Sequence, residues 1–346
     1  MATPDVSFVI AAYRAADSVG AAVESALAQR GVEVEVIVID DASPDRSSRF
    51  LCDHISDRVI FRERETNGGP GAARNDAIAL ASGRWIAVLD ADDVVEPDRA
   101  CAMIETAKSF SSEVVVDNQW VEDAANGRNT TFRRPMFPTD IWSSYKSIDA
   151  RSFIDDAVMF GRTHGYGYLK PLFSRDFIMR HGLRYDEDLR IGEDYDLMVQ
   201  AFAHGAQCAV HSACGYVYRI TDGSISRVLT LDHVREMKRA DAVLAASSAG
   251  QRMLRDPAIE AAARRRTRSL VRAENYLQLV AAIKDWRPDQ MISTTLRDPS
   301  AALLLRLPVV KRVSRAWHSL AKHVPVRQVE ERRNVAAGQS EDRNDR

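Results

Sequence analysis

The feature that most constrains the fold is a regular alternation of short β-branched runs with helix-like segments over the first ninety residues. Predicted strands cover residues 6–12, 34–39, 59–62 and 85–89, and predicted helices cover 18–30, a segment starting near Arg46, and 72–81. Strands that alternate with helices predict a doubly wound α/β domain with a mostly parallel sheet. In such sheets, ligands bind beyond the carboxyl ends of the strands.

Polar residues follow three of these predicted strands. Tyr13 comes just after the first, Asp40 and Asp41 end the second, and the fourth runs into Asp90 and the acids behind it. Because the carboxyl ends of parallel strands meet at one sheet edge, we expect these side chains to converge there. The convergence favours a nucleotide-type ligand over a purely structural role.

Three carboxylates occur within four residues, at Asp90, Asp92 and Asp93. Such clustered charge predicts a bound cation, and Mg²⁺ or Mn²⁺ suits an Asp-x-Asp turn that shares the ion with substrate phosphates. An EF-hand is excluded because Val95 stands where its loop requires glycine. The alternative is that Asp93 caps a following helix, which would leave Asp90 and Asp92 available to the ion.

Two further features at this edge have open interpretations. Asp41 or Ser43 could cap the helix predicted near Arg46, or one carboxylate of Asp40 and Asp41 could accept hydrogen bonds from a nucleobase or ribose. The loop at residues 67–75 is rich in glycine, but it lacks the Gly-Lys-Ser/Thr ending of a phosphate-binding loop. Its Arg74 could pair with a carboxylate or a phosphate.

A second acidic cluster lies about a hundred residues later, where Glu193, Asp194 and Asp196 open a predicted helix at residues 195–204. Acids at a helix N-terminus are favourable through the helix dipole alone. The preceding Gly192 indicates a structured turn, and a carboxylate held there could act as a general base.

The composition limits the classes of binding partner and the cellular compartment that we expect. The formal net charge of −2 argues against a nucleic-acid binder, and four cysteines without a CxxC pair favour a reducing compartment. Residues 6–12 form too short an apolar run for a signal peptide, so we expect a cytoplasmic protein. Residues 301–328 hold basic, leucine and tryptophan side chains and no acid. This segment either contacts the inner face of the membrane as a peripheral element or packs on the catalytic domain.

The five motifs together resemble those of family 2 inverting glycosyltransferases of the GT-A fold. They occur in the family's order over about residues 5–227, and the segment starting at Lys170 resembles the bacterial exopolysaccharide branch. The resemblance implies a GT-A domain at 1–228, with a nucleotide-binding half at 1–100 and an acceptor half at 101–228. A helical C-terminal region at 229–330 and a disordered tail at 331–346 complete the expected organisation.

The resemblance also implies a role for each matching residue. Tyr13 with Asp41 or Asp40 would hold the nucleobase, with Arg74 nearby. Asp90 and Asp92 would mark the ribose-diphosphate and metal site, with Mn²⁺ or Mg²⁺ on Asp92. Asp194 would deprotonate the acceptor hydroxyl with support from Glu193. Arg219, followed by Ser224 and Ser226, would meet the diphosphate.

The implied substrates are a nucleoside-diphosphate sugar, expected to be a UDP-sugar, and a saccharide or polyprenyl-linked acceptor. Two positions depart from the family pattern: Ala11 and Ala12 precede Tyr13 where proline is common, and Tyr195 replaces a frequent tryptophan. Two rival functions remain at this point. A sugar nucleotidyltransferase would need a lysine-containing glycine loop after the first strand, and a non-catalytic nucleotide-sugar binder would need no base.

Overall fold

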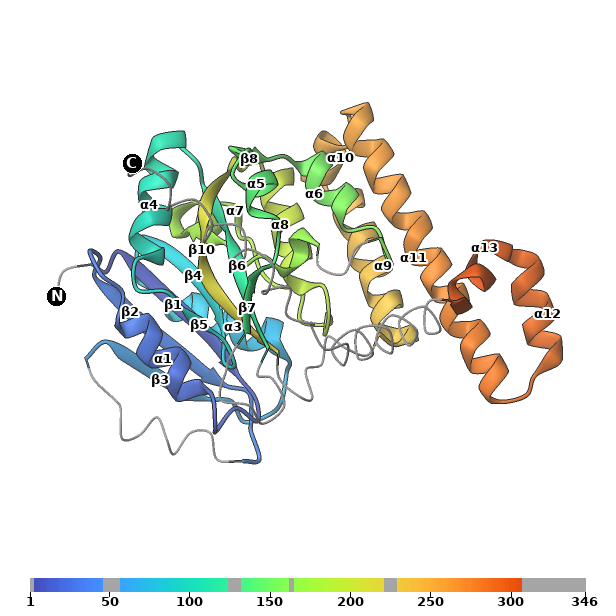
Figure 1. Cartoon of the computed structure of the whole chain (residues 1–346), viewed down its shortest axis with the longest axis horizontal. Helices are drawn as coiled ribbons and strands as arrows, with labels where there is room; N and C mark the ends of the chain where they lie inside the picture. The colour runs from blue at the N-terminus through green and yellow to red at the C-terminus, as the bar shows by residue number, and fades with distance from the viewer. Residues whose placement is uncertain (1–2, 46–56, 124–131, 162–164, 221–228, 307–346) are drawn as a thin grey trace, which may run out of the picture. The chain divides into compact units, whose positions relative to one another are not determined.

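The computed structural model of the chain describes residues 3–45, 57–123, 132–161, 165–220 and 229–306 (Figure 1). The helix predicted near Arg46, the serines Ser224 and Ser226, and the chain beyond residue 306 with its predicted tail lie outside these residues.

A single large sheet organises the N-terminal part of the chain. Its strands are β1 (Val6–Ala12), β2 (Val34–Asp40), β3 (Val59–Glu63), β4 (Trp85–Asp90), β5 (Val94–Val95), β6 (Val114–Asp123), β7 (Phe132–Pro135), β8 (Ser147–Ile148), β9 (Leu172–Ser174) and β10 (Cys208–Ile220). Their order is β3-β2-β1-β4-β9-β6-β10-β5, with β7 paired to β6 and β8 paired to β10. The four strands predicted in the first ninety residues are confirmed, each to within one residue of its predicted ends.

The sheet is parallel from β3 to β4 and mixed beyond it. β1 pairs in parallel with both β2 and β4, and β6 pairs in parallel with β10. β9 enters antiparallel between β4 and β6, with Ala87 opposite Leu172. The chain therefore approaches β9 from the edge at which β4 ends, which brings the residues just before β9 to the level of Asp90.

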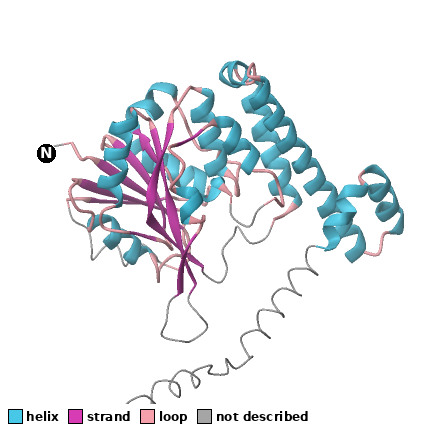
Figure 2. Cartoon of the chain, turned by 45° about the horizontal axis from the view of Figure 1, so that its top comes forward, coloured by secondary structure: helices cyan, strands magenta, loops and turns pink. Residues whose placement is uncertain are grey.

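Helices cover both faces of the sheet, as Figure 2 shows for the cyan helices around the magenta strands. The helices of the described residues are α1 (Val19–Leu27), α3 (Pro70–Leu80), α4 (Arg99–Phe110), α5 (Thr139–Trp142), α6 (Ala150–Asp156), α7 (Arg175–His181), α8 (Glu193–Ala203), α9 (Leu231–Ala246), α10 (Ser248–Met253), α11 (Pro257–Lys284), α12 (Pro288–Arg297) and α13 (Pro299–Ala302), with 3₁₀ turns at Tyr166–Tyr168 and Leu303–Leu305. α1 ends three residues before the predicted helix end, and α8 begins two residues before its predicted start.

Two apolar cores result, one on each face of the sheet. Phe8 and Ile10 of β1 are buried in the core that includes the apolar side of α1, whereas Val9 is buried in the core of α3 and α8. Alternate residues of one strand thus serve opposite cores, as the two-residue period of a strand requires. A buried strand of this kind reads as a continuous apolar run, which is why β1 and β2 are recognisable in the sequence.

Contacts divide the chain into a unit of residues 1–277 and a unit of residues 278–346. In the first unit, α9 and the start of α11 form a small core with the loop before α8, through Leu189, Val234, Met237 and Leu270. The second unit contains α12 and α13. None of the helices in the described ranges has the length and apolar character required to cross a membrane.

Candidate active site

The carboxyl ends of β1 and β2 lie side by side. Ala12 is level with Asp40 in the parallel register, and the Asp41 amide donates to the Ala12 carbonyl at 2.8 Å. Tyr13, the next residue, is exposed, and the Arg14 guanidinium lies 5.4 Å from the centre of its ring. The predicted grouping of Tyr13 with Asp40 and Asp41 at one edge therefore matches the geometry.

The two neighbouring aspartates differ in what they contact. Both oxygens of Asp41 accept backbone hydrogen bonds from the glycine loop, at 2.8 Å from Gly68 and 2.7 Å from Gly69. Gly69 has φ +90°, a conformation that favours glycine, and it immediately precedes α3. Asp40 accepts from the Ser43 amide at 3.1 Å, while its other oxygen is buried and has no hydrogen-bond partner among the described residues.

The turn after β4 does not start a helix, so the capping role considered for Asp93 is wrong. The short strand β5 follows it, and α4 begins later, after Asp98. Asp93 instead accepts from the Tyr216 hydroxyl at 2.7 Å and from the Arg219 amide at 2.8 Å. Burial, together with nearby Asp90 and Asp92, raises the pKa of Asp93 well above its usual range.

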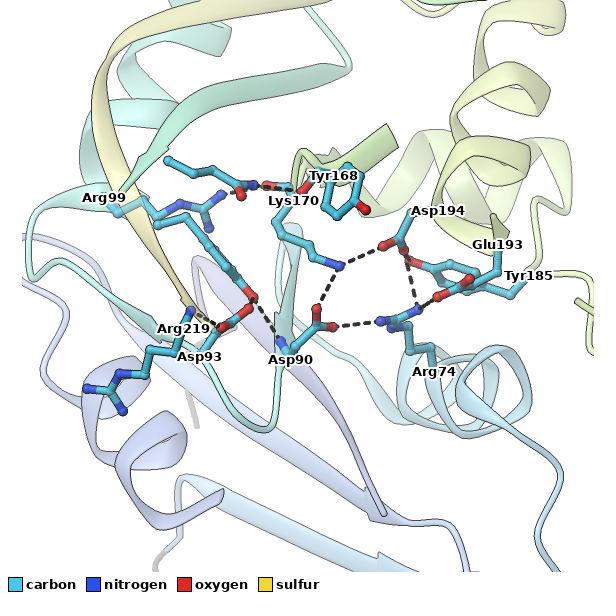
Figure 3. Close-up of polar contacts among 12 residues, drawn as sticks. Arg74, Asp90, Asp93, Arg99, Tyr168, Lys170, Tyr185, Glu193, Asp194 and Arg219 are labelled. Carbon is cyan, nitrogen blue, oxygen red and sulfur yellow. Dashed lines mark hydrogen bonds and ion pairs between the residues drawn. The ribbon is translucent and has the colours of Figure 1, made fainter. Parts of the chain in front are cut away.

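Two buried cations join the two acidic clusters into one ring (Figure 3). Arg74 of α3 lies 2.6 Å from Asp90 Oδ1 and 2.7 Å from Glu193 Oε1, and it also lies 3.3 Å from Asp194 Oδ1. Lys170 lies 2.8 Å from Asp90 Oδ2 and 2.7 Å from Asp194 Oδ2. Arg74 and Lys170 thus each connect the end of β4 to the start of α8.

The charges of this ring stabilise one another. Burial opposes ionisation of Asp90, but Lys170 and Arg74 outweigh it and hold the pKa of this carboxyl well below its usual range. Burial alone would lower the pKa of Lys170, yet Asp194 and Asp90 raise it above the usual value. Burial also raises the pKa of Glu193, with Asp194 adding to the effect. Lys170 is therefore a permanent cation at any working pH.

Asp194 is oriented from several sides. It lies in the first turn of α8, where a negative charge is favoured by the helix dipole. The Tyr185 hydroxyl donates to its Oδ1 at 3.2 Å, and burial, followed by the charge of Asp194, raises the pKa of Tyr185. Gly192, the residue before α8, has φ +90°, a conformation that favours glycine, and it sets the direction in which the chain enters the helix. Asp194 is thus a fixed and buried carboxylate, which suits a general base.

Tyr195 stands at a position where the family named above often has tryptophan. Its side chain faces away from the ring of charged residues. The Arg266 guanidinium of α11 lies 3.6 Å from the centre of its ring and donates to Asp241 at 2.9 Å. Tyr195 therefore contributes to the packing of α8 against α11.

The structure brings together Arg74, Asp90, Glu193 and Asp194 among the predicted site residues. Arg219 lies outside this group: its backbone amide donates to Asp93, and its guanidinium points away from Lys170 (Figure 3). Two residues that contact Asp194 were not predicted as site residues, Lys170 and Tyr185. The sequence signal for Lys170 was its place between two predicted acidic clusters in a chain segment that is otherwise apolar.

The described residues do not form a ready-made metal cage: no group of three or more His, Cys, Asp and Glu side chains in them could hold an ion. Both oxygens of Asp90 face cations, and both oxygens of Asp93 accept hydrogen bonds. Asp92 is partly exposed at the turn. The residues present fit only a cation that takes most of its ligands from a phosphate-bearing substrate, a mode of binding that Mg²⁺ adopts readily.

Comparison with known proteins identifies the family of this chain. The model of Glycosyl transferase family 2 matches residues 7–177. The chain is 41% identical over 341 residues to the succinoglycan biosynthesis protein ExoO of Rhizobium meliloti, covering 95% of this chain and 94% of that protein. It is 37% identical over 225 residues to WfaP of Escherichia coli, covering 64% of this chain and 79% of that protein. WfaP is described as a UDP-Glc:alpha-D-GlcNAc-diphosphoundecaprenol beta-1,3-glucosyltransferase.

A solved structure has the same fold. S. aureus TarS 1-349 in complex with UDP-GlcNAc superposes with a TM-score of 0.58 at 16% identity, over 85% of this chain and 92% of that one. The resemblance inferred from the motifs is therefore confirmed, and a sugar nucleotidyltransferase is excluded. The chain belongs to glycosyl transferase family 2, and it is a glycosyltransferase of the GT-A fold.

Proposed function

We propose that this enzyme transfers a sugar from a UDP-sugar to a hydroxyl of a lipid-linked saccharide, with inversion at the anomeric carbon, in exopolysaccharide synthesis. The likeness to ExoO supports the pathway class, and the name of WfaP supports both the UDP donor and the lipid diphosphate acceptor. The observation that carries the proposal is the buried carboxylate of Asp194, joined through Lys170 and Arg74 to Asp90 at the strand end.

Asp194 is the proposed general base. It would take the proton of the acceptor hydroxyl while that oxygen attacks the anomeric carbon from the face opposite the diphosphate. The new C–O bond forms as the bond to the diphosphate breaks, so the configuration inverts. The proton ends on Asp194 and the electron pair leaves with the nucleoside diphosphate. Glu193, held by Arg74 at 2.7 Å, would support the orientation of α8.

The nucleoside would lie across the ends of β1 and β2. The exposed ring of Tyr13 offers a stacking face, and the buried Asp40 oxygen, which has no partner within the described part of the chain, can accept a hydrogen bond from a base N–H. Asp41 holds the glycine loop that starts α3, so its proposed contribution is to shape this site. Arg219 is the proposed diphosphate contact from β10.

The proposed cofactor is Mn²⁺ or Mg²⁺ at Asp92. When bound, such an ion supplies charge neutralisation to the departing diphosphate. Asp90 is the less suitable ligand, since Arg74 and Lys170 engage both of its oxygens. Its proposed role is to position these two cations at the donor edge. In this proposal residues 1–100 form the nucleotide half, 101–228 the acceptor half and 229–330 a helical region.

A peripheral contact with an anionic membrane is the proposed means of reaching a lipid-linked acceptor. On α12, Ile292 and the 76% exposed Leu296 lie one turn apart, while Thr294 of the same helix is buried. Just before α12, Trp286 is 87% exposed and has φ +51°, an unfavourable conformation for a bulky residue. An apolar stripe that faces outward beside Arg287 and Arg297, followed by the acid-free segment 301–328, suits anionic lipid.

Donor hydrolysis tests the proposal without knowledge of the acceptor. The purified chain is incubated with a panel of UDP- and GDP-sugars, with Mn²⁺ or with EDTA, and the released nucleoside diphosphate is measured. Metal-dependent UDP release from one donor, lost in Asp92→Ala and in Asp194→Asn, is the expected result. Absence of release and of metal-dependent donor binding across the panel would contradict the proposal. Release that persists in Asp194→Asn would contradict the assignment of the base.

A further inference from the structure

The backbone of Lys170 is held in place by contacts with other parts of the fold. It lies two residues before β9, and because Leu172 pairs with Ala87, it reaches the level of the end of β4. The Lys170 carbonyl accepts a hydrogen bond from Arg99 Nη2 at 2.5 Å, and Arg99 is itself paired with the buried Asp117 at 2.9 Å. The main chain at Lys170 is therefore fixed by a second buried ion pair, independent of the ring.

The ammonium group connects the two sides of the site. Lys170 is only 7% exposed, and its Nζ contacts Asp90 on β4 and Asp194 on α8. Arg74 joins the same two elements but uses the opposite oxygen of each carboxylate, Asp90 Oδ1 and Asp194 Oδ1. Each carboxylate plane is thereby held at both oxygens (Figure 3).

We propose that Lys170 is a positioning residue that aligns Asp194 for proton abstraction and ties that alignment to Asp90 at the donor edge. The inference rests on the proposed function, in which Asp194 is the base. A buried ion pair contributes little net stability compared with apolar residues of similar size, so fold stability alone does not account for this lysine. Correct orientation of a base, by contrast, governs the rate of the chemical step.

The charged and titratable groups that face Asp194 come from four elements or segments. They are Arg74 of α3, Lys170 before β9, Tyr185 before α8, and Glu193 of α8 itself. Of these, Lys170 provides the closest cation, at 2.7 Å. After its removal, the remaining contacts from Arg74 and Tyr185 hold only Oδ1 of Asp194. We therefore expect a slower reaction with little change in donor binding.

The test uses Lys170→Met in the full chain, with UDP release from the donor that is active in the panel. We expect kcat to fall at least about tenfold and UDP affinity by calorimetry to change less than about threefold. Lys170→Arg, which keeps the charge and a donor, should restore most of kcat. Lys108→Met, in an exposed pair with Glu105, is the matched control and should behave as wild type.

The outcomes separate this inference from the proposed function. If Asp194→Asn abolishes release while Lys170→Met retains wild-type kcat, the positioning role is wrong and the base assignment stands. If Lys170→Met weakens UDP binding and leaves kcat unchanged, Lys170 is a donor-binding residue and the inference is overturned. If circular dichroism shows that Lys170→Met is unfolded, Lys170→Gln is judged by the same criteria, because it keeps a hydrogen-bond donor without the charge.

Discussion

Asp196 offers a test of how the three acids of α8 divide their roles. It lies two residues beyond the proposed base, is buried, and accepts a hydrogen bond from Gln200 at 2.7 Å. Burial raises its pKa from 3.8 to about 6, and neighbouring Asp186 and Asp241 add to this effect. The perturbation is Asp196→Asn, which removes the charge and keeps an oxygen that can accept the same hydrogen bond.

The expected magnitude follows from linkage. A rise in pKa from 3.8 to about 6 corresponds to about 3 kcal/mol. Because the folded pKa lies above the unfolded one, the folded protein binds the extra proton, and the free energy of unfolding falls as pH rises from about 4 to about 6. Asp196→Asn should therefore be more stable than wild type by up to about 3 kcal/mol at pH 8, and by about half of that at pH 5.

Urea unfolding at pH 5 and pH 8 measures the difference. The control is Asp232→Asn, an exposed acid in the first turn of α9, which should change the free energy of unfolding by about 0.5 kcal/mol or less. UDP release should be unaffected by Asp196→Asn but reduced about a hundredfold or more by Asp194→Asn. Equal stabilities of Asp196→Asn and wild type at both pH values would refute the reasoning from burial.

Three further predictions concern the buried Arg74, the metal ligand Asp92 and the exposed apolar residues near α12. Arg74→Met should lower the free energy of unfolding by about 3 kcal/mol or more, because it leaves buried carboxylates without their partner; the exposed Arg264→Met should cost about 0.5 kcal/mol or less in the same urea assay. EDTA should weaken calorimetric binding of UDP to wild type but not to Asp92→Ala, and equal weakening in both would contradict the metal ligand. Trp286→Ala with Leu296→Ser should reduce flotation with anionic vesicles, and unchanged flotation would contradict the membrane contact; Val243→Ser, an exposed apolar residue of α9, is the control.

The parallel half of the sheet could be predicted because its signal is local. The strands β1 and β2 are buried on both faces and read as continuous apolar runs. β6 could not be predicted in full: only its start, Val114–Val116, is an apolar β-branched run, whereas the strand continues to Asp123. Its polar residues Asp117, Asn118 and Gln119 are buried because each finds a partner from a distant segment, Arg99, Phe137 and Tyr168 respectively.

The same distinction applies to the site. The acidic turns could be identified because they interrupt apolar patterns. The ion pairs that join the two turns could not be predicted, because they are made by Arg74 and Lys170, which are separated by 96 positions in the chain. The apolar residues around Lys170 are a weak signal that this lysine is buried, because lysines are mostly exposed in folded proteins. The position of Lys170 follows from the antiparallel entry of β9, a feature of the tertiary topology.

The three carboxylates after β4 are therefore not equivalent, although their spacing suggested one shared cation. Asp90 is neutralised by two side chains of the chain itself, and Asp93 is buried with a raised pKa and two hydrogen bonds. Asp92, which is partly exposed, is the carboxylate proposed to meet an ion from outside. A single carboxylate binds Mg²⁺ weakly, and most of the ligands would have to come from phosphate oxygens and water. We infer that the ion and the nucleotide bind together, so that the electrostatic balance of the ring is complete before the donor arrives and does not depend on the metal.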